Sequence, residues 1–273
     1  MTIGTEEDAL EFIRRHVHEN YGIYFPDEKL YSLKSKLERR MTKVDCESLR
    51  DYADYLQGNP DEIPFFLDAI TTNKTYFFRE PNHWKYFEEH LIPAWKDQSE
   101  VRIWSAACSS GEEPYTASIL MEEALRQGII NLPSDYKVLG SDVSEQVLRV
   151  GSRGIYSRDQ VQKVREYRVS FAEHYFEEDE QSNYRVSESL QNHVYFRQFN
   201  LVFNGNPFRK QFDLILLRNV LIYFDQEMIQ NVIRHCEQLL SPGGYLFIGH
   251  TETIREIDHT LEKQAPSIFQ KNV

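Results

Sequence analysis

The sequence predicts an α/β fold in which a helical region is followed by a doubly wound parallel sheet with helices on both faces. Residues up to about 96 read as helices throughout and contain no convincing strand. From about residue 100, short apolar runs alternate with helical patterns, which is typical of strands joined by helices. Polar and turn-forming residues between β-rich pieces at 171–197 predict a small inserted antiparallel β subdomain.

The composition allows one large domain or two smaller ones with a packed core, because 41% of the 273 residues are hydrophobic. A net charge of −12 disfavours general binding to nucleic acid or anionic membranes. The chain has only three cysteines, which are far apart, and no CxxC, so we expect reduced thiols, no metal site and a cytoplasmic location. The N-terminal stretch MTIGTEEDAL is acidic and lacks an apolar core, so we expect no signal peptide. We expect no membrane insertion either, since no apolar run approaches about 20 residues.

The helical region contains five stretches that read as helices: EDALEFIRRHV, EKLYSLKSKLERRMTKV, SLRDYADYLQG, DEIPFFLDAI and EPNHWKYFEEHLIPAW. Pro81 stands at a favoured helix start in the last of them. We expect a helical domain over 1–80, a linker helix over 81–98 and the α/β domain over 99–273.

Five apolar runs predict the strands: VRIWSA, YKVLGSD, VYFRQFNL, FDLILLRN and GGYLFIGH. The run LILL is apolar at successive positions, which favours a central strand buried on both faces. We expect Pro242, Gly243 and Gly244 to form a structural turn before the last of these strands.

The first of these strands leads through a loop of small residues, 106–111, into a helix that opens on Glu112 and Glu113. Ligands of doubly wound sheets bind beyond the carboxyl ends of the strands, so this loop belongs to the site. Two acids in the first helical turn repel a pyrophosphate, which disfavours a nicotinamide dinucleotide and favours a cationic ligand without phosphate, such as S-adenosylmethionine. Alternatively, both acids are ordinary first-turn residues that stabilise the helix.

Other polar residues follow predicted strands at the same edge. Asp142 ends the second strand, where an acid commonly binds ribose hydroxyls, and it also fits a helix N-cap. The pair Arg218–Asn219 leaves the buried apolar strand where a substrate would be positioned, although the Asn also suits a loop. Tyr223 follows on the same segment.

The stretch TTNKTYFFRE at 71–80 lies between the two regions. Asn73, Thr75 and Arg79 are spaced around aromatic residues there, and a junction between domains is a favoured ligand position. Arg79 also fits a plain interdomain salt bridge.

Six segments, in order, resemble the CheR-type chemotaxis receptor methyltransferases, which are protein-glutamate O-methyltransferases: TTNKTYFFRE, WSAACSSGEEPYTASIL, SDVSEQVLRVGSRGIYS, FNL, FDLILLRNVLIYFD and PGGYLFIGHTE. The resemblance covers about 70–270. It implies a small all-helical N-terminal domain, a Rossmann-like S-adenosylmethionine-dependent methyltransferase domain and a three-stranded β insertion. It also implies methyl transfer to glutamates on the cytoplasmic helical bundle of a chemoreceptor, with S-adenosylhomocysteine as the second product.

By motif position, the resemblance implies cofactor contacts from Asn73, Thr75, Arg79, Ala106, Glu112, Glu113, Asp142, Asn200, Leu201, Arg218 and Asn219. Arg79 and Tyr223 would lie nearest the reacting methyl group, and which glutamate touches the cofactor stays open. Some family members carry a glycine-containing loop in the insertion that docks a receptor tether. The segment here, EEDEQSN, is short and acidic, so we expect no tether docking and direct contact with the receptor bundle. We also expect a monomer.

The acceptor carboxylate has a reference pKa near 4.3 and is an anion at pH 7, so the reaction needs positioning rather than a general base. A basic patch of Lys36, Arg39, Arg40 and Lys43 on the second predicted helix suits an acidic receptor helix, or else is a solvated helix face. A nucleic-acid methyltransferase is disfavoured because RNVLIYF replaces the usual Asn/Asp-Pro-Pro-aromatic stretch. A non-catalytic cofactor-sensing protein stays an alternative that an assay decides.

Overall fold

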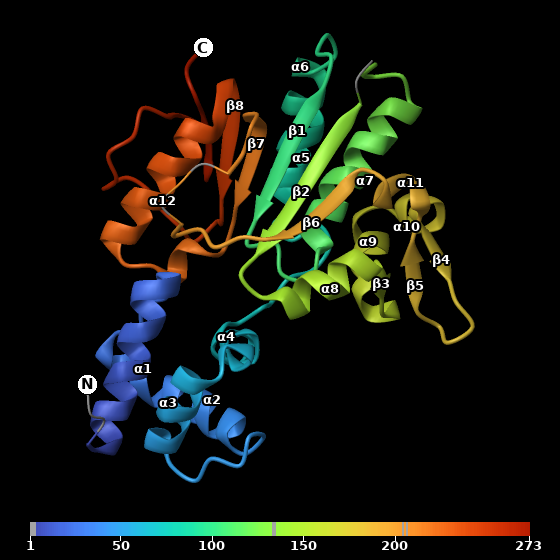
Figure 1. Cartoon of the computed structure of the whole chain (residues 1–273). Helices are drawn as coiled ribbons and strands as arrows, with labels where there is room; N and C mark the ends of the chain where they lie inside the picture. The colour runs from blue at the N-terminus through green and yellow to red at the C-terminus, as the bar shows by residue number, and fades with distance from the viewer. Residues whose placement is uncertain (1–3, 133–134, 204, 206) are drawn as a thin grey trace.

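The computed structural model describes residues 4–132, 135–203, 205 and 207–273. A helical N-terminal domain lies below a seven-stranded sheet that is flanked by helices (Figure 1). This domain contains α1 (Glu6–Tyr21), α2 (Leu30–Met41), α3 (Leu49–Gly58) and α4 (Ile63–Ile70), with 3-10 turns at Asp27–Lys29 and Pro60–Glu62. Within the described residues, no helix combines the length and apolarity needed to cross a bilayer.

Helix α1 begins and ends at residues suited to those positions. Thr5 and Asp8 form a capping box at its start, so two backbone N–H groups find partners. Gly22 ends the helix with φ of 70°. A Cβ atom at this glycine would lie 2.5 Å from Val202 in the second domain, so only glycine allows the two domains to approach this closely.

The main sheet has the strand order β6-β2-β1-β7-β8-β10-β9. Its members are β1 (Val101–Ala106), β2 (Tyr136–Asp142), β6 (Val194–Gln198), β7 (Phe212–Leu217), β8 (Leu240–Ile248), β9 (Glu262–Ala265) and β10 (Ile268–Gln270). All five predicted strands belong to it, and β7, which contains LILL, is the central strand. Unlike the parallel expectation, β10 runs antiparallel to both of its neighbours, β8 and β9. A two-residue turn joins β9 to β10, which permits only a hairpin between these two strands.

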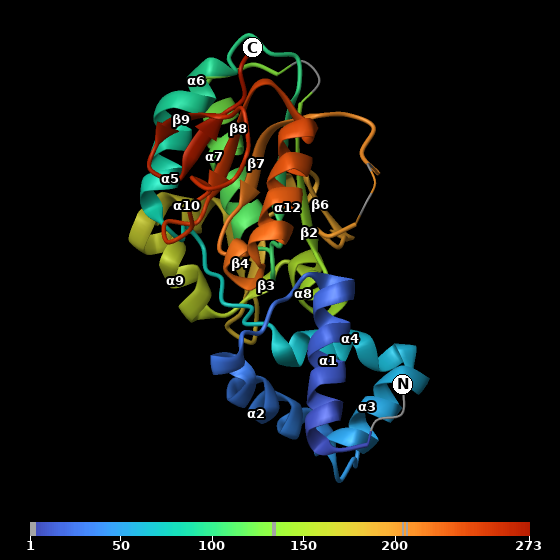
Figure 2. The same cartoon turned by 90° about the vertical axis from the view of Figure 1, so that its left-hand side faces the viewer.

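Helices cover both faces of this sheet (Figure 2). One face carries α7 (Glu112–Arg126) and a continuous helical segment made of α5 (Pro81–Tyr86), a π-helical turn (Phe87–Leu91) and α6 (Ile92–Ala94). The other face carries α12 (Gln226–Leu239), and α8 (Glu145–Arg153) lies against β2 and β6. In β7, alternate residues enter the two cores: Leu214 and Leu216 one, Ile215 and Leu217 the other. The segment predicted as a linker helix thus packs on the sheet.

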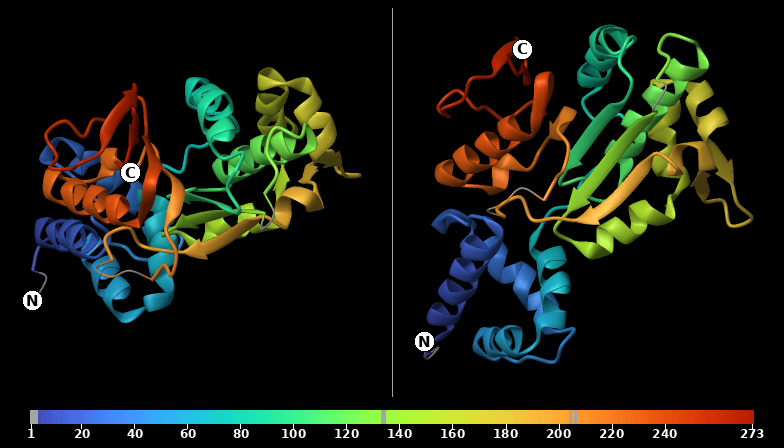
Figure 3. Two further views of the ribbon diagram at one scale, coloured as in Figure 1. Left: turned by 90° about the horizontal axis from the view of Figure 1, so that it is seen from above. Right: turned by 45° about the horizontal axis from the view of Figure 1, so that its top comes forward.

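The antiparallel insertion is present and extends from the edge of the sheet farthest from the C-terminal strands (Figure 1 and Figure 3). Its strands β3 (Ile155–Tyr156), β4 (Phe176–Glu178) and β5 (Tyr184–Val186) pair in the order β3-β5-β4, together with α9 (Arg158–Tyr167), α10 (Val169–Tyr175) and α11 (Glu188–Gln191). The insertion starts earlier than the predicted range 171–197, because β3 is too short to show a strand pattern. The end of that range, from Val194, belongs to β6, which pairs with β2 in the main sheet.

Candidate functional site

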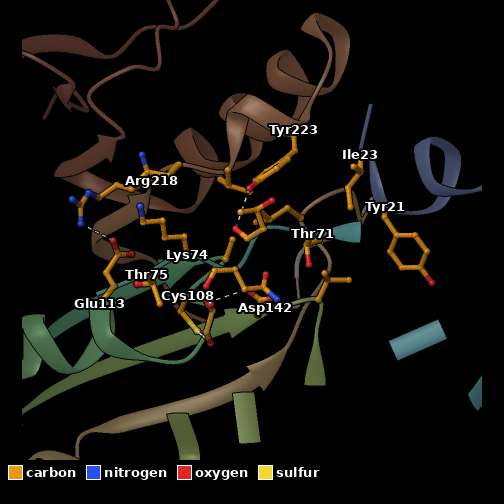
Figure 4. A pocket seen from close by; sticks show the side chains of 18 of the residues that line it. Tyr21, Ile23, Thr71, Lys74, Thr75, Cys108, Glu113, Asp142, Arg218 and Tyr223 are labelled. Atoms are coloured by element: carbon orange, nitrogen blue, oxygen red, sulfur yellow. Dashed lines mark hydrogen bonds and ion pairs between the residues drawn. The ribbon is translucent and has the colours of Figure 1, made fainter. Parts of the chain in front are cut away.

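A cavity lies where the carboxyl ends of β1, β2 and β7 meet the N-terminal domain, with about 880 Å³ of space that is partly open to solvent. A pocket at a junction between domains is a favoured position for a small-molecule ligand. Its lining comprises Tyr21, Ile23, Thr71, Thr72, Asn73, Lys74, Thr75, Arg79, Ala107, Cys108, Ser109, Glu113, Asp142, Val143, Phe199, Asn200, Leu201, Arg218, Asn219, Val220, Tyr223 and Phe224. Figure 4 shows Tyr21 and Ile23 on the side opposite Glu113 and Arg218.

The loop after β1 forms the floor of the cavity through an unusual backbone. Ala107 and Ser109 both have positive φ, 59° and 51°, a region that residues with a Cβ rarely adopt. Gly111 has φ of 93°, and a Cβ there would lie 2.9 Å from the Cα of Gly151. Such strain concentrates at functional sites, so the small residues of this loop serve its close turn as well as access for a ligand.

The two glutamates that open α7 point to different places. Glu113 lines the cavity, where it accepts hydrogen bonds from Ser105 Oγ and Arg218 Nη1, both at 2.7 Å. Glu112 is buried outside the cavity lining and accepts from Ser110 Oγ at 2.7 Å and Gln160 Nε2 at 2.8 Å. Burial raises the pKa of both carboxyl groups, and at Glu113 the Arg218 cation opposes the rise.

Asp142 lies at the end of β2 with only 7% of its surface exposed. Its two carboxylate oxygens accept one backbone N–H each, from Ser144 and Ser109, both at 2.9 Å. Burial raises its pKa, and these two hydrogen bonds oppose the rise. The N-cap of α8 is Ser144 rather than Asp142, so the capping alternative does not explain this carboxylate at the cavity wall.

Arg218 and Asn219 leave β7 and enter the cavity wall, as Figure 4 shows for Arg218. The Arg218 side chain is 1% exposed, forms ion pairs with Glu113 and Glu80, and donates to the Arg79 carbonyl oxygen. Asn219 has φ of 59° and donates from Nδ2 to Glu80 at 3.1 Å. An asparagine that only satisfied nearby backbone groups would not make this side-chain bond to a carboxylate 139 positions away, so the loop alternative does not account for Asn219.

The segment before α5 supplies three of the expected side chains. Asn73 lines the cavity and donates to Asp68 at 3.0 Å, and Thr75 lines it too. Arg79 donates from Nη1 to the Lys74 carbonyl oxygen at 2.6 Å. Among the described residues Arg79 forms no ion pair, so the salt-bridge alternative finds no support. Tyr223 donates from its hydroxyl to the Thr72 carbonyl oxygen at 3.1 Å, so both side chains hold this segment in place.

Comparison with known proteins identifies the family. The domain described as "CheR methyltransferase, all-alpha domain" matches residues 8–71, and "CheR methyltransferase, SAM binding domain" matches residues 73–268. The chain belongs to the CheR methyltransferase family. Among its relatives is the chemotaxis protein methyltransferase of Borreliella burgdorferi, 33% identical over 280 residues that span 100% of this chain and 97% of that protein.

Two further chemotaxis protein methyltransferases are similar over nearly the whole chain. The Escherichia coli protein is 30% identical over 94% of this chain and 88% of its own length. "Chemotaxis protein methyltransferase 2" of Pseudomonas aeruginosa is 31% identical over 97% and 93%. This CheR family member is therefore an S-adenosylmethionine-dependent methyltransferase, and its cofactor is S-adenosylmethionine.

The cavity fits this cofactor. Its lining presents a carboxylate, Glu113, of the kind that suits an ammonium or a sulfonium, and a second one, Asp142, whose oxygens each retain acceptor capacity beyond one backbone N–H, as ribose hydroxyls require. Of the expected contact residues, only Ala106 and Glu112 are absent from the lining, because Ala106 is buried within β1 and Glu112 turns towards α9. Asn200 and Leu201 line the cavity as expected.

Sequence reasoning missed the contribution of the N-terminal domain to the wall. Tyr21 and Ile23 flank Gly22, far from every motif along the chain. The available signal was the glycine between two large apolar residues at a helix end, which indicates a close turn. Lys74 was also missed, although it lies inside the motif TTNKTYFFRE and lines the cavity beside Arg79.

The predicted basic patch separates into two pairs. Arg40 forms an ion pair with the buried Glu62, and Lys36 donates from Nζ to the Ile70 carbonyl oxygen at 2.6 Å. Burial lowers the pKa of Lys36. Arg39 and Lys43 are exposed, the first on α2 and the second just after it. Only the second pair is therefore available to a partner without loss of an internal contact.

One cluster within the described residues has donor atoms arranged for a metal: Glu80, His83 and His250, whose ligand atoms lie within 4.8 Å of one another. The Glu80 carboxylate already accepts from three partners, and the Arg218 guanidinium lies 3.1 Å from it. A second cation would meet this guanidinium, so we do not assign a metal here.

Proposed function

We propose that the protein transfers the methyl group of S-adenosylmethionine to glutamate side chains on the cytoplasmic helical bundle of a chemoreceptor, giving methyl esters for sensory adaptation. The observation that carries this proposal is the cavity itself. Its two acidic residues, Glu113 and Asp142, are both engaged by hydrogen bonds, so neither is a free base. Such a site suits an acceptor that is already anionic, as a glutamate is at neutral pH. The chemotaxis names of the relatives support the same acceptor.

The proposed cofactor contacts are the expected residues that line the cavity: Asn73, Thr75, Arg79, Glu113, Asp142, Asn200, Leu201, Arg218 and Asn219. Glu113 takes the role that the sequence left open between the two glutamates. Glu112 and Ala106 support the loop and helix behind the wall rather than touch the ligand.

S-adenosylmethionine supplies an electrophilic methyl group. The residues of the chain have to hold the acceptor carboxylate in line with it and exclude water. Arg79 and Tyr223 are the proposed residues for this task, because both line the cavity and both anchor the Thr72–Lys74 segment. Arg79 uses one donor on that segment, which leaves other N–H groups of its guanidinium for the acceptor or the cofactor carboxylate.

Arg39 and Lys43 are the proposed receptor contacts, since they are exposed and suit an acidic helix by charge complementarity. Lys36 and Arg40 support the helical domain instead, through their bonds to Ile70 and Glu62. We propose that the enzyme is a cytoplasmic monomer that acts on the receptor bundle. It does so without tether docking in this proposal, because the β4–β5 connection is the short acidic segment 179–183.

The test is transfer of labelled methyl from S-adenosylmethionine to cytoplasmic fragments of candidate receptors, with release of label by mild base as readout. Base lability separates a carboxyl ester from an N-methyl group. Arg79→Ala should lose transfer by about two or more orders of magnitude with the fold intact. Cofactor binding without transfer to any receptor fragment would refute the proposal and favour a cofactor-sensing protein. Near-normal transfer by the Arg79→Ala variant would refute the role of Arg79 alone.

A further inference from the structure

The inserted β subdomain reaches the loop that forms the floor of the cavity. Gln160, in the first turn of α9, donates from Nε2 to Glu112 Oε1 at 2.8 Å, and the other oxygen of Glu112 accepts from Ser110 Oγ at 2.7 Å. Tyr156, in β3, donates from its hydroxyl to the Ser110 carbonyl oxygen at 2.8 Å. Two residues of the insertion therefore hold Ser110, one directly and one through Glu112, although neither lines the cavity.

Ser110 belongs to the loop whose conformation decides the shape of the cavity floor. The preceding residues Ala107, Cys108 and Ser109 line the cavity, and two of them have a positive φ that is unfavourable for a residue with a Cβ. A loop keeps such a conformation only when the surrounding structure fixes it. Asp142 fixes this loop at the Ser109 N–H, and the insertion fixes it at Ser110.

The start of a helix does not by itself account for the buried carboxyl group of Glu112. An acidic residue in the first turn interacts favourably with the helix dipole while it is exposed to water, so the position requires no burial. Glu112 is nevertheless only 1% exposed, and no lysine, arginine or histidine side chain in the described part of the chain pairs with it. Burial raises the pKa of this carboxyl group, and the hydrogen bonds from Ser110 and Gln160 oppose the rise. The carboxyl group thus serves to join two donors that come from separate segments.

We propose that Gln160 is a positioning residue for the cofactor: through Glu112, it holds the loop 107–111 in the shape that binds S-adenosylmethionine. The two ends of its amide serve different segments. The Oε1 atom accepts from the Ser157 N–H at 3.0 Å and so caps α9, whereas Nε2 donates to Glu112. The insertion therefore takes part in cofactor binding without touching the cofactor.

The test is Gln160→Glu, which changes the contact with Glu112 and keeps the cap of α9. Glutamate serves a capping box as well as glutamine does, so the bond from Ser157 is retained. Opposite Glu112, however, the variant presents a second carboxyl group. A close pair of carboxyl groups shares one proton in acid and keeps a hydrogen bond, whereas both groups ionise and repel each other in base.

The expected signature is a loss of affinity that depends on pH. Isothermal titration calorimetry of Gln160→Glu should give affinities for S-adenosylmethionine and S-adenosylhomocysteine within about twofold of the wild type at about pH 5.5, and about tenfold weaker than the wild type at about pH 8. Tyr156 and Cys108 are the other titratable groups close to the Glu112 carboxyl group. Burial raises the pKa of both well above their usual values, so neither changes charge in this range.

Exchanging the two side chains should restore the contact in the opposite direction. In the double variant with Glu112→Gln and Gln160→Glu, the amide lies on α7 and donates to the carboxylate on α9. Ser110 Oγ then donates to the amide oxygen, and the Ser157 N–H donates to the other carboxylate oxygen. Both affinities should return to within about threefold of the wild type at both pH values.

The matched control is Gln191→Glu, the same substitution in the same subdomain. Gln191, on α11, donates from Nε2 to the Val186 carbonyl oxygen at 2.7 Å, so this variant also loses a donor and places a carboxyl group against an acceptor. It lies outside the cavity lining and makes no bond to the loop 107–111. Its affinities should match those of the wild type at both pH values.

Three results would overturn the proposal: wild-type affinity of folded Gln160→Glu in base, an equal fall of its affinity at both pH values, or a double variant as weak as the single one. An equal loss in Gln191→Glu would also overturn it, because the cause would then be a less stable insertion. If Gln160→Glu unfolds in base, the double variant decides, since it has to bind as the wild type does. Calorimetry measures cofactor binding alone, so the outcome does not depend on whether receptor glutamates are the acceptor.

Discussion

Replacing Asp142 with asparagine tests whether its carboxylate holds a ligand or only the loop. Each of its oxygens accepts one backbone N–H at 2.9 Å, from Ser109 and Ser144. Asparagine presents an oxygen to one of these groups and an NH₂ to the other. One buried N–H therefore loses its acceptor, and the ribose hydroxyls lose an anionic one.

The two effects have separate magnitudes. A hydrogen bond to a charged group contributes about 1.5–3 kcal/mol, so the free energy of unfolding should fall by about 2 kcal/mol. For a chain of this size that corresponds to a drop of about 6 °C in the melting temperature. Loss of the ribose contacts adds about 1–3 kcal/mol to the binding free energy, which is roughly a 5- to 150-fold loss of affinity. Both ligands contain the ribose, so S-adenosylmethionine and S-adenosylhomocysteine should weaken equally.

Calorimetric titration measures the two affinities, and thermal unfolding measures stability. The control is Asp179→Asn in the β4–β5 turn, where the backbone N–H groups of Gln181 and Asn183 both donate to one carboxylate oxygen at 2.9 Å. Because asparagine keeps that oxygen, this control should keep both its stability and both affinities. If Asp142→Asn loses stability and yet binds both ligands as tightly as the wild type, the carboxylate only supports the loop and our reasoning about the ribose is wrong.

Three other predictions follow from contacts in the structure. Charge reversal of Arg39 and Lys43 should reduce receptor methylation by about tenfold at low salt with unchanged cofactor affinity, and an equal fall in cofactor affinity would contradict their role. Burial, followed by the Arg218 cation, lowers the pKa of His83 to about 3, below its usual value of 6.5. The neutral, buried form of His83 therefore stabilises the fold above pH 6.5, and this stabilisation is lost as the pH falls towards 3. Between pH 7 and pH 5, the free energy of unfolding of His83→Phe, measured by urea titration, should therefore fall less than that of the wild type. Dialysis against a chelator should change neither melting temperature nor cofactor affinity; a loss that zinc restores would show that Glu80, His83 and His250 hold a metal.

The sequence predicted the parts of the fold whose pattern is local. The five strands of the α/β region and the helical N-terminal region are all confirmed, because apolar periodicity and burial agree along each of them. Three short strands were not predicted. β3 and β10 have only two and three residues, too few to show an alternating pattern, and β9 reads EKQA, with no large apolar residue.

The site shows the same division. A polar residue directly after an apolar strand is visible in the sequence, which is why Asp142, Arg218 and Asn219 were predicted at the edge where the cavity lies. Contacts that depend on tertiary packing cannot be recognised in the sequence in this way. Glu112 and Glu113 are adjacent in the first turn of α7, and only the orientation of the helix decides which of them faces the cavity. Similarly, nothing in the motif marks Glu80 as a partner of residues almost 140 positions away.

The walls of the cavity come from both domains, and this constrains how the enzyme works. Three contacts join the domains at its edge: Tyr24 N–H to the Tyr223 carbonyl oxygen at 2.7 Å, Asn200 Nδ2 to the Asn20 carbonyl oxygen at 2.7 Å, and His18 to Asp225 at 2.6 Å. All three lie at the end of α1 or just after it, next to Tyr21 and Ile23. The domain that carries the proposed receptor contacts therefore also closes the cofactor cavity. Under the proposed function, acceptor recognition and cofactor binding belong to the domain pair, because separating the domains removes a wall of the cavity together with the basic surface.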